Sequence, residues 1–320
     1  MTLAIAPISA VIPTRNRAAA LARMLESLVR QEVLPAELIV VDASPDSRTQ
    51  DVVTAFAADP AHGGCRAVWL KAERAGAATQ RNQGVARATQ PIVAFFDDDI
   101  LFEPGCLQRL WRALEADAAL GGVNAMITNQ RYLPPGFVSR ALFCILAGRR
   151  SQTYAGRVLG PAVNLLPEDA ANLPDVTPCD WLNTTCTLYR REALPQPPFP
   201  DNFRGYSMME DLALSLVVGR NRKLANVRTA RVYHDSQPAE HKADAAALSR
   251  MELVNRHYIM SEIMNRRGIA DYAKLALWEL FQSGVSLVQQ RGGPQFWRIM
   301  YGRMAGLGDI LFAKPSRSGP

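Results

Sequence analysis

The sequence of 320 residues predicts an α/β fold, with a mostly parallel central sheet flanked by helices and a helical extension at the C-terminus. Three observations predict it. Over the first hundred residues, short apolar runs alternate with segments whose apolar residues recur at helical spacing, which is the pattern of βαβ units. Polar residues directly follow several apolar runs, as they do at the ligand-binding edge of such sheets. After about His241, helical patterning dominates to the end.

The first hundred residues are expected to contain four strands, with a helix after each of the first three. The strands are predicted at residues 8–12, 38–41, 67–70 and 92–96, and the helices at 18–31, 47–58 and 77–88. Pro13 is expected to end the first strand, because proline lacks the amide hydrogen that a sheet uses.

The remaining elements are predicted in the same way. Helices are expected at 104–116, 210–219, 244–267, 271–290 and 295–312, with a helix that starts at 190 and is broken by prolines after 194. Strands are expected at 122–128, 185–189 and 225–233. Residues 133–180 are rich in proline and are predicted to form loops with short helices that shape a binding cleft.

The composition narrows the class of protein. Hydrophobic residues make up 48% and charged residues 21%, as in an ordinary globular chain. The net charge of +6 suits phosphate-bearing substrates or an anionic membrane surface and is too weak to indicate nucleic acid. Five cysteines without C-x-x-C spacing argue against a disulfide framework or a zinc site and favour a reducing cytosol. We find no secretory signal at the N-terminus and no apolar run long enough to span a bilayer.

The strongest chemical signal is the run Asp97, Asp98 and Asp99 after the predicted strand at 92–96. Three adjacent carboxylates repel one another unless a cation is present. Carboxylate oxygens and a diphosphate are natural ligands of a divalent metal, which would offset charge on a departing nucleoside diphosphate. The competing interpretation is a solvated turn that caps the next helix.

A second acidic pair, Glu210 and Asp211, opens the predicted helix at 210–219. It is a candidate general base for an acceptor hydroxyl, although acidic residues also stabilise a helix N-terminus. His234 follows the predicted strand at 225–233 and could bind a metal, although a single histidine is more often structural.

Further candidates lie at the ends of the first three strands. Asp42 could accept a hydrogen bond from a base or ribose, or simply belong to a turn. Residues 14–17 could hold a nucleotide beside the first helix or only cap it. Arg74 and Arg81 could bind phosphate or brace the aspartates, or lie on a solvated helix face.

Taken together and in order, these segments resemble glycosyltransferase family 2, the inverting group with the GT-A fold. The resemblance rests on 11–17 (VIPTRNR), 40–44 (VVDAS), 81–88 (RNQGVARA), 95–99 (FFDDD), Glu210–Asp211 and His234, and it spans residues 8–235. The segment before the acidic pair departs from the family, because its glycine is displaced to Gly205. Residues 133–180 match no family segment that we can name.

The resemblance implies a role for each candidate residue. Asp211 would be the catalytic base, with Glu210 as the competing candidate, and Asp99 and His234 would bind the metal, Mg²⁺ or Mn²⁺. The expected nucleotide-sugar contacts are Pro13, Thr14, Arg15, Asp42, Arg74, Arg81, Asp97 and Asp98. Residues 181–185 resemble the family's acceptor-side segment.

The implied reaction is transfer of a sugar, with inversion, from a UDP- or dTDP-sugar to a hydroxyl of a glycan or lipid-linked acceptor. The resemblance also suggests polysaccharide synthesis for the cell envelope. We expect a GT-A catalytic domain at 1–240, with a nucleotide half to about 128 and an acceptor half from about 129, and a helical region at 241–320. The alternatives are a sugar nucleotidyltransferase, which usually has a glycine-rich loop where this chain has 13–17, and a non-catalytic nucleotide- or glycan-binding relative.

The helical tail carries much of the excess charge. Residues 236–320 hold eleven Lys or Arg and seven Asp or Glu, interleaved with aromatic residues such as Trp278, Trp297 and Tyr301. It is expected either to pack on the sheet domain or on a second subunit of a homodimer, or to rest on anionic lipid. The expected localisation is cytoplasmic. A tail that rests on anionic lipid would add peripheral contact at the inner face of the cytoplasmic membrane.

Overall fold

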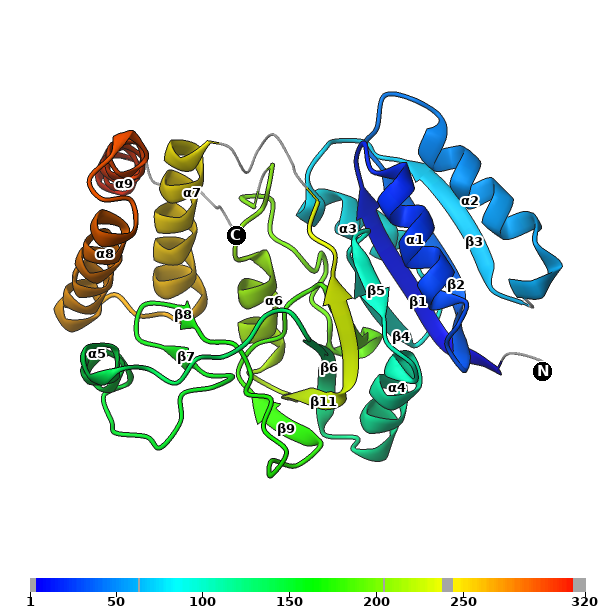
Figure 1. Cartoon of the computed structure of the whole chain (residues 1–320), viewed down its shortest axis with the longest axis horizontal. Coiled ribbons are helices and arrows are strands. Elements are labelled where there is room, and N and C mark those ends of the chain that lie inside the picture. The colour runs from blue at the N-terminus through cyan, green and yellow to red at the C-terminus, as the bar shows by residue number, and fades with distance from the viewer. Residues whose placement is uncertain (1–3, 63, 204, 238–243, 313–320) are drawn as a thin grey trace. The chain divides into compact units, whose positions relative to one another are not determined.

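The structure is a computed structural model that describes residues 4–62, 64–203, 205–237 and 244–312. Contacts between residues divide the chain into two compact units (Figure 1). The first consists of Met1–Pro134, Thr153–Val158 and Asn164–Gln237, and the second of Pro135–Gln152, Leu159–Val163 and Pro238–Pro320. The domain boundary predicted at residue 240 falls within 238–243, outside the described residues.

The sheet unit follows the predicted alternation of strands and helices. Its strands are β1 (Ala4–Thr14), β2 (Val33–Asp42), β3 (Arg66–Lys71), β4 (Ile92–Phe96), β5 (Ile100–Phe102), β6 (Leu120–Ile127), β9 (Val176–Cys179), β10 (Cys186–Arg190) and β11 (Lys223–His234). Its helices are α1 (Ala18–Leu28), α2 (Arg48–Ala58), α3 (Ala77–Arg87), α4 (Cys106–Ala116) and α6 (Glu210–Val218), with short 3-10 turns η1 (Pro60–His62) and η2 (Arg191–Ala193). Strands β7 (Val158–Leu159) and β8 (Val163–Asn164) form a separate two-stranded sheet.

The main sheet has the strand order β3-β2-β1-β4-β10-β6-β11-β5, and β9 also pairs with β11. Strands β3, β2, β1 and β4 run parallel, as do β6 and β11, whereas β10 is antiparallel to both of its neighbours. Because parallel strands end at the same edge, the residues that follow β1, β2 and β4 come together there. The mixed α/β sheet agrees with the predicted fold class.

Strand β1 runs through Pro13, so the prediction that proline ends this strand is wrong. Pairing of β1 with β4 stops at Val11, whereas pairing with β2 continues to Thr14. The carbonyl of Thr14 accepts a hydrogen bond from the amide of Ala43, after β2. Because successive residues of a strand point their backbone groups to opposite sides, the nitrogen of Pro13 faces the side where no strand is paired.

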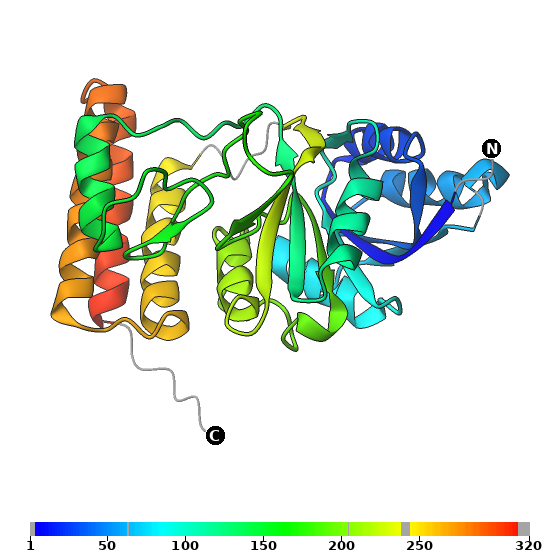
Figure 2. The ribbon, with the colours of Figure 1, turned by 90° about the horizontal axis from the view of Figure 1, so that it is seen from below.

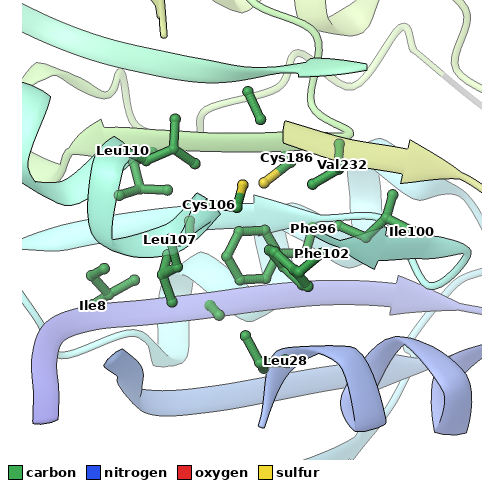
Figure 3. Packing of buried hydrophobic residues seen from close by; sticks show 14 of the residues in the cluster. Ile8, Leu28, Phe96, Ile100, Phe102, Cys106, Leu107, Leu110, Cys186 and Val232 are labelled. Carbon is green, nitrogen blue, oxygen red and sulfur yellow. The ribbon is translucent and has the colours of Figure 1, made fainter. Parts of the chain in front are cut away.

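The hydrophobic core lies between the sheet and the helices that cover it (Figure 3). Phe96 of β4 packs edge-on against Phe102 of β5, with ring centroids 5.1 Å apart. Helix α4 contributes Leu107, Leu110 and Leu114 to the same cluster. These residues follow one another at intervals of three and four, which is the spacing of one helix face. Each such buried side chain contributes roughly 1.5–3 kcal/mol to folding, so the core fixes the strands that end at the site.

The second unit is helical. It contains α5 (Phe137–Ala147), α7 (Ala245–Tyr258), a π-helical turn η4 (Ile259–Ile263), α8 (Ile269–Gln289) and α9 (Pro294–Phe312). Helix α5 lies beside α8 (Figure 1 and Figure 2), where Lys274 of α8 donates to the carbonyl of Leu146 at 3.1 Å. The guanidinium of Arg256 is buried in it, 2.7 Å from Glu252 and 5.6 Å from the ring centre of Trp278. No helix among the described residues is long and apolar enough to cross a membrane.

Three segments of the chain differ from the expected elements. Residues 133–180 form an eleven-residue helix, α5, and three strands, rather than loops with short helices only. Strand β5 was not expected, because three apolar residues directly after three aspartates give no periodic signal. The helix expected to start at residue 190 is only the three-residue turn η2.

Candidate active site

The acidic run lies directly beyond β4, at the edge of the sheet where the parallel strands end. The amide of Asp97 donates to the carbonyl of Thr185 (3.0 Å), and β11 brings His234 beside Ile100 through its pairing with β5. As a result, ligand atoms of Asp97, Asp99 and His234 all lie within 4.8 Å of one another. The imidazole Nε2 of His234 is 3.1 Å from an oxygen of Asp99. Asp97, expected to contact the nucleotide sugar, therefore joins the two residues expected to bind metal.

Asp98 and Asp99 are both buried and are balanced by one cation. The guanidinium Nη1 of Arg17 donates to Asp98 (3.1 Å) and to Asp99 (3.0 Å), and the hydroxyl of Thr14 donates to Asp98 (2.6 Å). Burial raises the pKa of Asp98 to about 6, against the opposing effects of Arg17 and Thr14. Burial also acts against the charged form of Asp99, but His234 and Arg17 outweigh it and hold the pKa of Asp99 below its ordinary value.

Arg81 joins this cluster to the second acidic pair. Its guanidinium donates to Glu210 through Nη1 (2.7 Å) and to Asp97 through Nη2 (2.8 Å). The side chain is only 4% exposed, so the ion pairs are shielded from water and salt. The carboxylates of Asp97 and Glu210 raise the pKa of Arg81 despite the opposing effect of its burial. One buried cation thus fixes the distance between two groups of carboxylates that are 113 residues apart in the chain.

The acidic pair opens α6, as predicted. Burial raises the pKa of Glu210 to about 8, with the neighbouring Asp211 contributing and Arg81 opposing. Burial likewise raises the pKa of Asp211 to about 6, although the amide of Leu212 donates to its carboxylate at 2.7 Å. Both groups therefore hold protons more tightly than ordinary carboxylates, which is a feature of acid–base sites.

Residues 181–185 are attached to the first turns of α6. The hydroxyl of Ser215 donates to the carbonyl of Asp211 (2.7 Å) and accepts from the amide of Leu182 (2.9 Å). The segment then reaches Thr185, whose carbonyl accepts from Asp97. The side-chain oxygen of Asn183 is buried with no hydrogen-bond partner among the described residues. The segment expected on the acceptor side therefore borders both the acidic pair and the acidic run.

Asp42 is the last residue of β2 and lies opposite Thr14 of β1 in the register of these two strands. Its carboxylate accepts from the amide of Ser44 (2.8 Å) and from the indole of Trp69 (3.2 Å). Gln80 of α3 donates to the carbonyls of Thr14 (2.9 Å) and Val41 (2.7 Å), which ties the ends of β1 and β2 together. These polar groups lie at the same sheet edge as the acidic run.

Not every predicted residue joins these contacts. Arg15 is exposed on the loop after β1, and Arg74 is exposed and donates to the hydroxyl of Thr79 (3.2 Å). Conversely, Arg17 and Gln80 were absent from the predicted site residues. Arg17 belongs to residues 14–17, which were predicted to hold a nucleotide, but nothing in the sequence indicates that its side chain turns toward the aspartates. The only signal for Gln80 is its place directly before Arg81.

Slightly less than half of the chain matches the model of a known family. Residues 9–161 match the model of Glycosyl transferase family 2. That segment of the chain belongs to glycosyl transferase family 2. The match contains the loop after β1, Asp42, Arg81 and the acidic run, and it confirms the resemblance inferred from the sequence.

Curated relatives agree over the same region. An uncharacterized glycosyltransferase of Bacillus subtilis (strain 168) is 35% identical over 141 residues, which are 44% of this chain and 50% of that protein. A validoxylamine A glucosyltransferase of Streptomyces hygroscopicus subsp. limoneus is 34% identical over 110 residues, 33% of this chain and 23% of that protein. The aligned segments thus span half or less of these relatives.

Two solved structures are similar over nearly the whole chain. One is a mannosyltransferase from Pyrobaculum calidifontis in complex with GDP-Man and Mn²⁺, with a TM-score of 0.53, 16% identity and coverage of 98% of this chain and 78% of that one. The other is TarS of S. aureus in complex with UDP-GlcNAc, with a TM-score of 0.58, 17% identity and coverage of 95% and 80%. These similarities concern the fold, and they confirm the predicted GT-A architecture with helices at the C-terminus.

Proposed function

We propose that this protein is an inverting, metal-dependent glycosyltransferase that moves a sugar from a nucleoside-diphosphate sugar to an acceptor hydroxyl. The observation that carries the proposal is the buried bridge of Arg81, which holds Glu210 beside the cluster of Asp97, Asp99 and His234. The proposed leaving-group site is thereby held next to the acidic pair that contains the proposed proton acceptor, Asp211. Family membership of residues 9–161 supports the same reaction class.

The donor set suits Mg²⁺ or Mn²⁺. Two carboxylates and one imidazole converge within 4.8 Å, and hard oxygen ligands with a single nitrogen favour these ions. Asp97, Asp99 and His234 would hold the ion, and Arg17 and Thr14 hold Asp98 beside it. When bound, the ion supplies positive charge that offsets the charge of the departing diphosphate. The Mn²⁺ in the similar mannosyltransferase structure is consistent with this assignment.

Asp211 is proposed as the general base, and Glu210 is the competing candidate. Glu210 is paired with Arg81, whereas Asp211 forms no ion pair within the part of the chain that the structure describes. The acceptor hydroxyl would give its proton to Asp211 while its oxygen bonds to the anomeric carbon. The bond from that carbon to the diphosphate breaks at the same time, and the nucleoside diphosphate leaves. Attack opposite the leaving group inverts the anomeric carbon, so no covalent intermediate with the protein is needed.

The nucleotide is proposed to lie along the ends of β1 and β2. Asp42 and Thr14 offer buried polar groups there, and Pro13 precedes Thr14 in β1. Arg15 and Arg74, both exposed, are proposed to reach the phosphates. We propose a UDP- or dTDP-sugar as the donor; the similar solved structures hold GDP-Man and UDP-GlcNAc.

The acceptor is proposed to be a hydroxyl of a glycan or of a lipid-linked sugar in cell-envelope polysaccharide synthesis. Residues 181–185 border both the base and the acidic run, which makes them the candidate acceptor contacts. A sugar nucleotidyltransferase is the competing function. The loop after β1 reads PTRNR and lacks the glycines that such enzymes use to approach a triphosphate, so we favour transfer of the sugar.

Calorimetric titration with UDP, dTDP and GDP tests this proposal. Each nucleotide is titrated with Mn²⁺ or with a chelator into wild type, Asp99→Ala and the surface control Asp51→Ala. We expect one nucleotide to bind tightly, and only with Mn²⁺; Asp99→Ala should abolish this binding and Asp51→Ala should leave it intact. Failure of all three nucleotides to bind in either condition would remove the nucleotide-sugar hypothesis.

A further inference from the structure

Helices α8 and α9 each carry a row of exposed apolar side chains. The rows are represented by Ile269, Leu280 and Leu287 on α8 and by Trp297, Tyr301 and Met304 on α9, which together we call the outer face. Small residues complete the rows at the same three- and four-residue spacing: Ala273, Ala276, Gly284 and Gly308. Leu280 is 71% and Trp297 66% exposed, so these side chains are not core residues.

Both rows lie on the same side of the helix pair. On α9, Gly302 and Gly306 face α7, because a Cβ on Gly302 would come within 2.2 Å of an α7 carbonyl oxygen. On α8, Leu275 packs against α7 and Trp278 lies over an α7 arginine. The outer face lies about half a helical turn from these residues on each helix, so it points away from α7.

The outer face is large for an unpartnered surface. Helix α8 has 21 residues, so it is about 30 Å long, and two adjacent helices are about 20 Å wide. The rows cover about 27 Å of α8 and about 17 Å of α9, so the outer face spans about 400 Å². This is within the range of the largest exposed apolar patches on monomeric proteins, which are often functional.

The charge of the helical unit indicates which partner fits. The segments of this unit hold fourteen Lys or Arg and seven Asp or Glu, whereas the rest of the chain holds 22 and 23. The helical unit therefore carries a balance of +7 and the sheet unit −1. Arg291 lies in the turn between α8 and α9, and Arg298 is 60% exposed beside Trp297, so cations border the uncharged face.

We propose that the outer face docks on an anionic lipid surface, with α8 and α9 lying in the plane of the membrane. Apolar side chains enter the boundary of the lipid, tryptophan and tyrosine prefer that depth, and arginines at the rim meet acidic headgroups. A second copy of this chain fits less well, because two units of the same positive charge would repel across the contact. The inference goes beyond the transfer reaction and does not depend on it.

Vesicle sedimentation of the full chain tests this docking without any nucleotide. Phosphatidylcholine vesicles with and without phosphatidylglycerol are compared for wild type, for the double variant Leu280→Gln/Trp297→Gln, and for Leu133→Gln. Leu133 is 79% exposed in the sheet unit, so it is a matched control for replacing a surface leucine. Because all three positions are exposed, the variants should keep the wild-type circular dichroism and melting temperature.

We expect wild type and Leu133→Gln to sediment with the anionic vesicles, more weakly as salt is added. The double variant should bind the anionic vesicles at least roughly tenfold more weakly than wild type, because two large apolar side chains no longer leave water. Absence of wild-type binding to either vesicle, or equal binding by the double variant, overturns the proposal. A wild-type dimer in light scattering that the double variant converts to monomer would also overturn it, because the face would then join two copies of the chain.

Discussion

Replacing Asp211 with asparagine should stabilise the fold while removing activity. Burial raises the pKa of Asp211 from 3.8 to about 6. The pKa of Asp211 is thus higher in the folded state than in the unfolded state. Its contribution to folding stability is therefore fully present below about pH 4, and it is lost as the pH rises through about 6. Two pKa units correspond to roughly 3 kcal/mol, and the partial exposure of the side chain reduces this to about 1–2 kcal/mol.

Urea unfolding followed by tryptophan fluorescence, in the presence of a chelator, measures this effect. At about pH 8, Asp211→Asn should raise the free energy of unfolding by about 1–2 kcal/mol, and the gain should shrink toward zero near pH 4. The turnover rate should fall by roughly 10²–10⁴-fold, the usual contribution of a general base. Asp51→Asn, on the exposed side of α2, should change neither quantity. A loss of stability at pH 8, or a gain that does not vary with pH, would refute the reasoning.

Three further substitutions test separate parts of the structure. Arg81→Met should destabilise the fold by about 3–5 kcal/mol in urea unfolding, since it leaves two carboxylates without their buried partner; a smaller loss than about 1 kcal/mol would contradict the buried bridge. His234→Ala should weaken Mn²⁺ binding by at least roughly tenfold in calorimetry, whereas His62→Ala, far from the cluster, should not; equal affinities would exclude His234 as a ligand. Gly84→Ala places a Cβ 2.3 Å from a valine of β1 and should lower the free energy of unfolding by about 1–3 kcal/mol. Gly284→Ala, with open space around it, should raise that free energy by up to about 1 kcal/mol. Thermal melting that ranks the two variants the other way would contradict the packing.

The sequence predicts those parts of the fold that depend on local pattern. The strand at 92–96 is an unbroken apolar run followed by three aspartates, and both its bounds and its place at the binding edge follow from that pattern. The position of β10 does not follow, because antiparallel insertion between β4 and β6 depends on contacts about 65–95 residues apart. Helix α5 is also hidden, since the prolines that surround it outweigh its apolar spacing in a local reading.

The candidate site was predictable by residue type and only partly by geometry. Aspartates at strand ends indicate a cation site wherever they occur, and a histidine after a strand is a reasonable further ligand. Which aspartate faces which partner depends on tertiary structure. Asp98 is turned to Thr14 and Arg17, whereas Asp97 shares Arg81 with Glu210. These pairings join five elements of the sheet unit, and no local pattern encodes them.

The most direct test of the central claim identifies which bond of the donor is broken. Purified protein is incubated with UDP-, dTDP- and GDP-sugars, with Mn²⁺ or chelator, and with a mixture of glycans whose hydroxyls, or water in their place, take up the sugar. The nucleotide products are separated by ion-exchange chromatography. The account predicts that one donor yields its nucleoside diphosphate, that this requires Mn²⁺, and that Asp211→Asn and His234→Ala each slow its formation strongly. Release of a nucleoside monophosphate, or formation of pyrophosphate from a nucleoside triphosphate and a sugar phosphate, would contradict sugar transfer and assign the site to nucleotidyl chemistry.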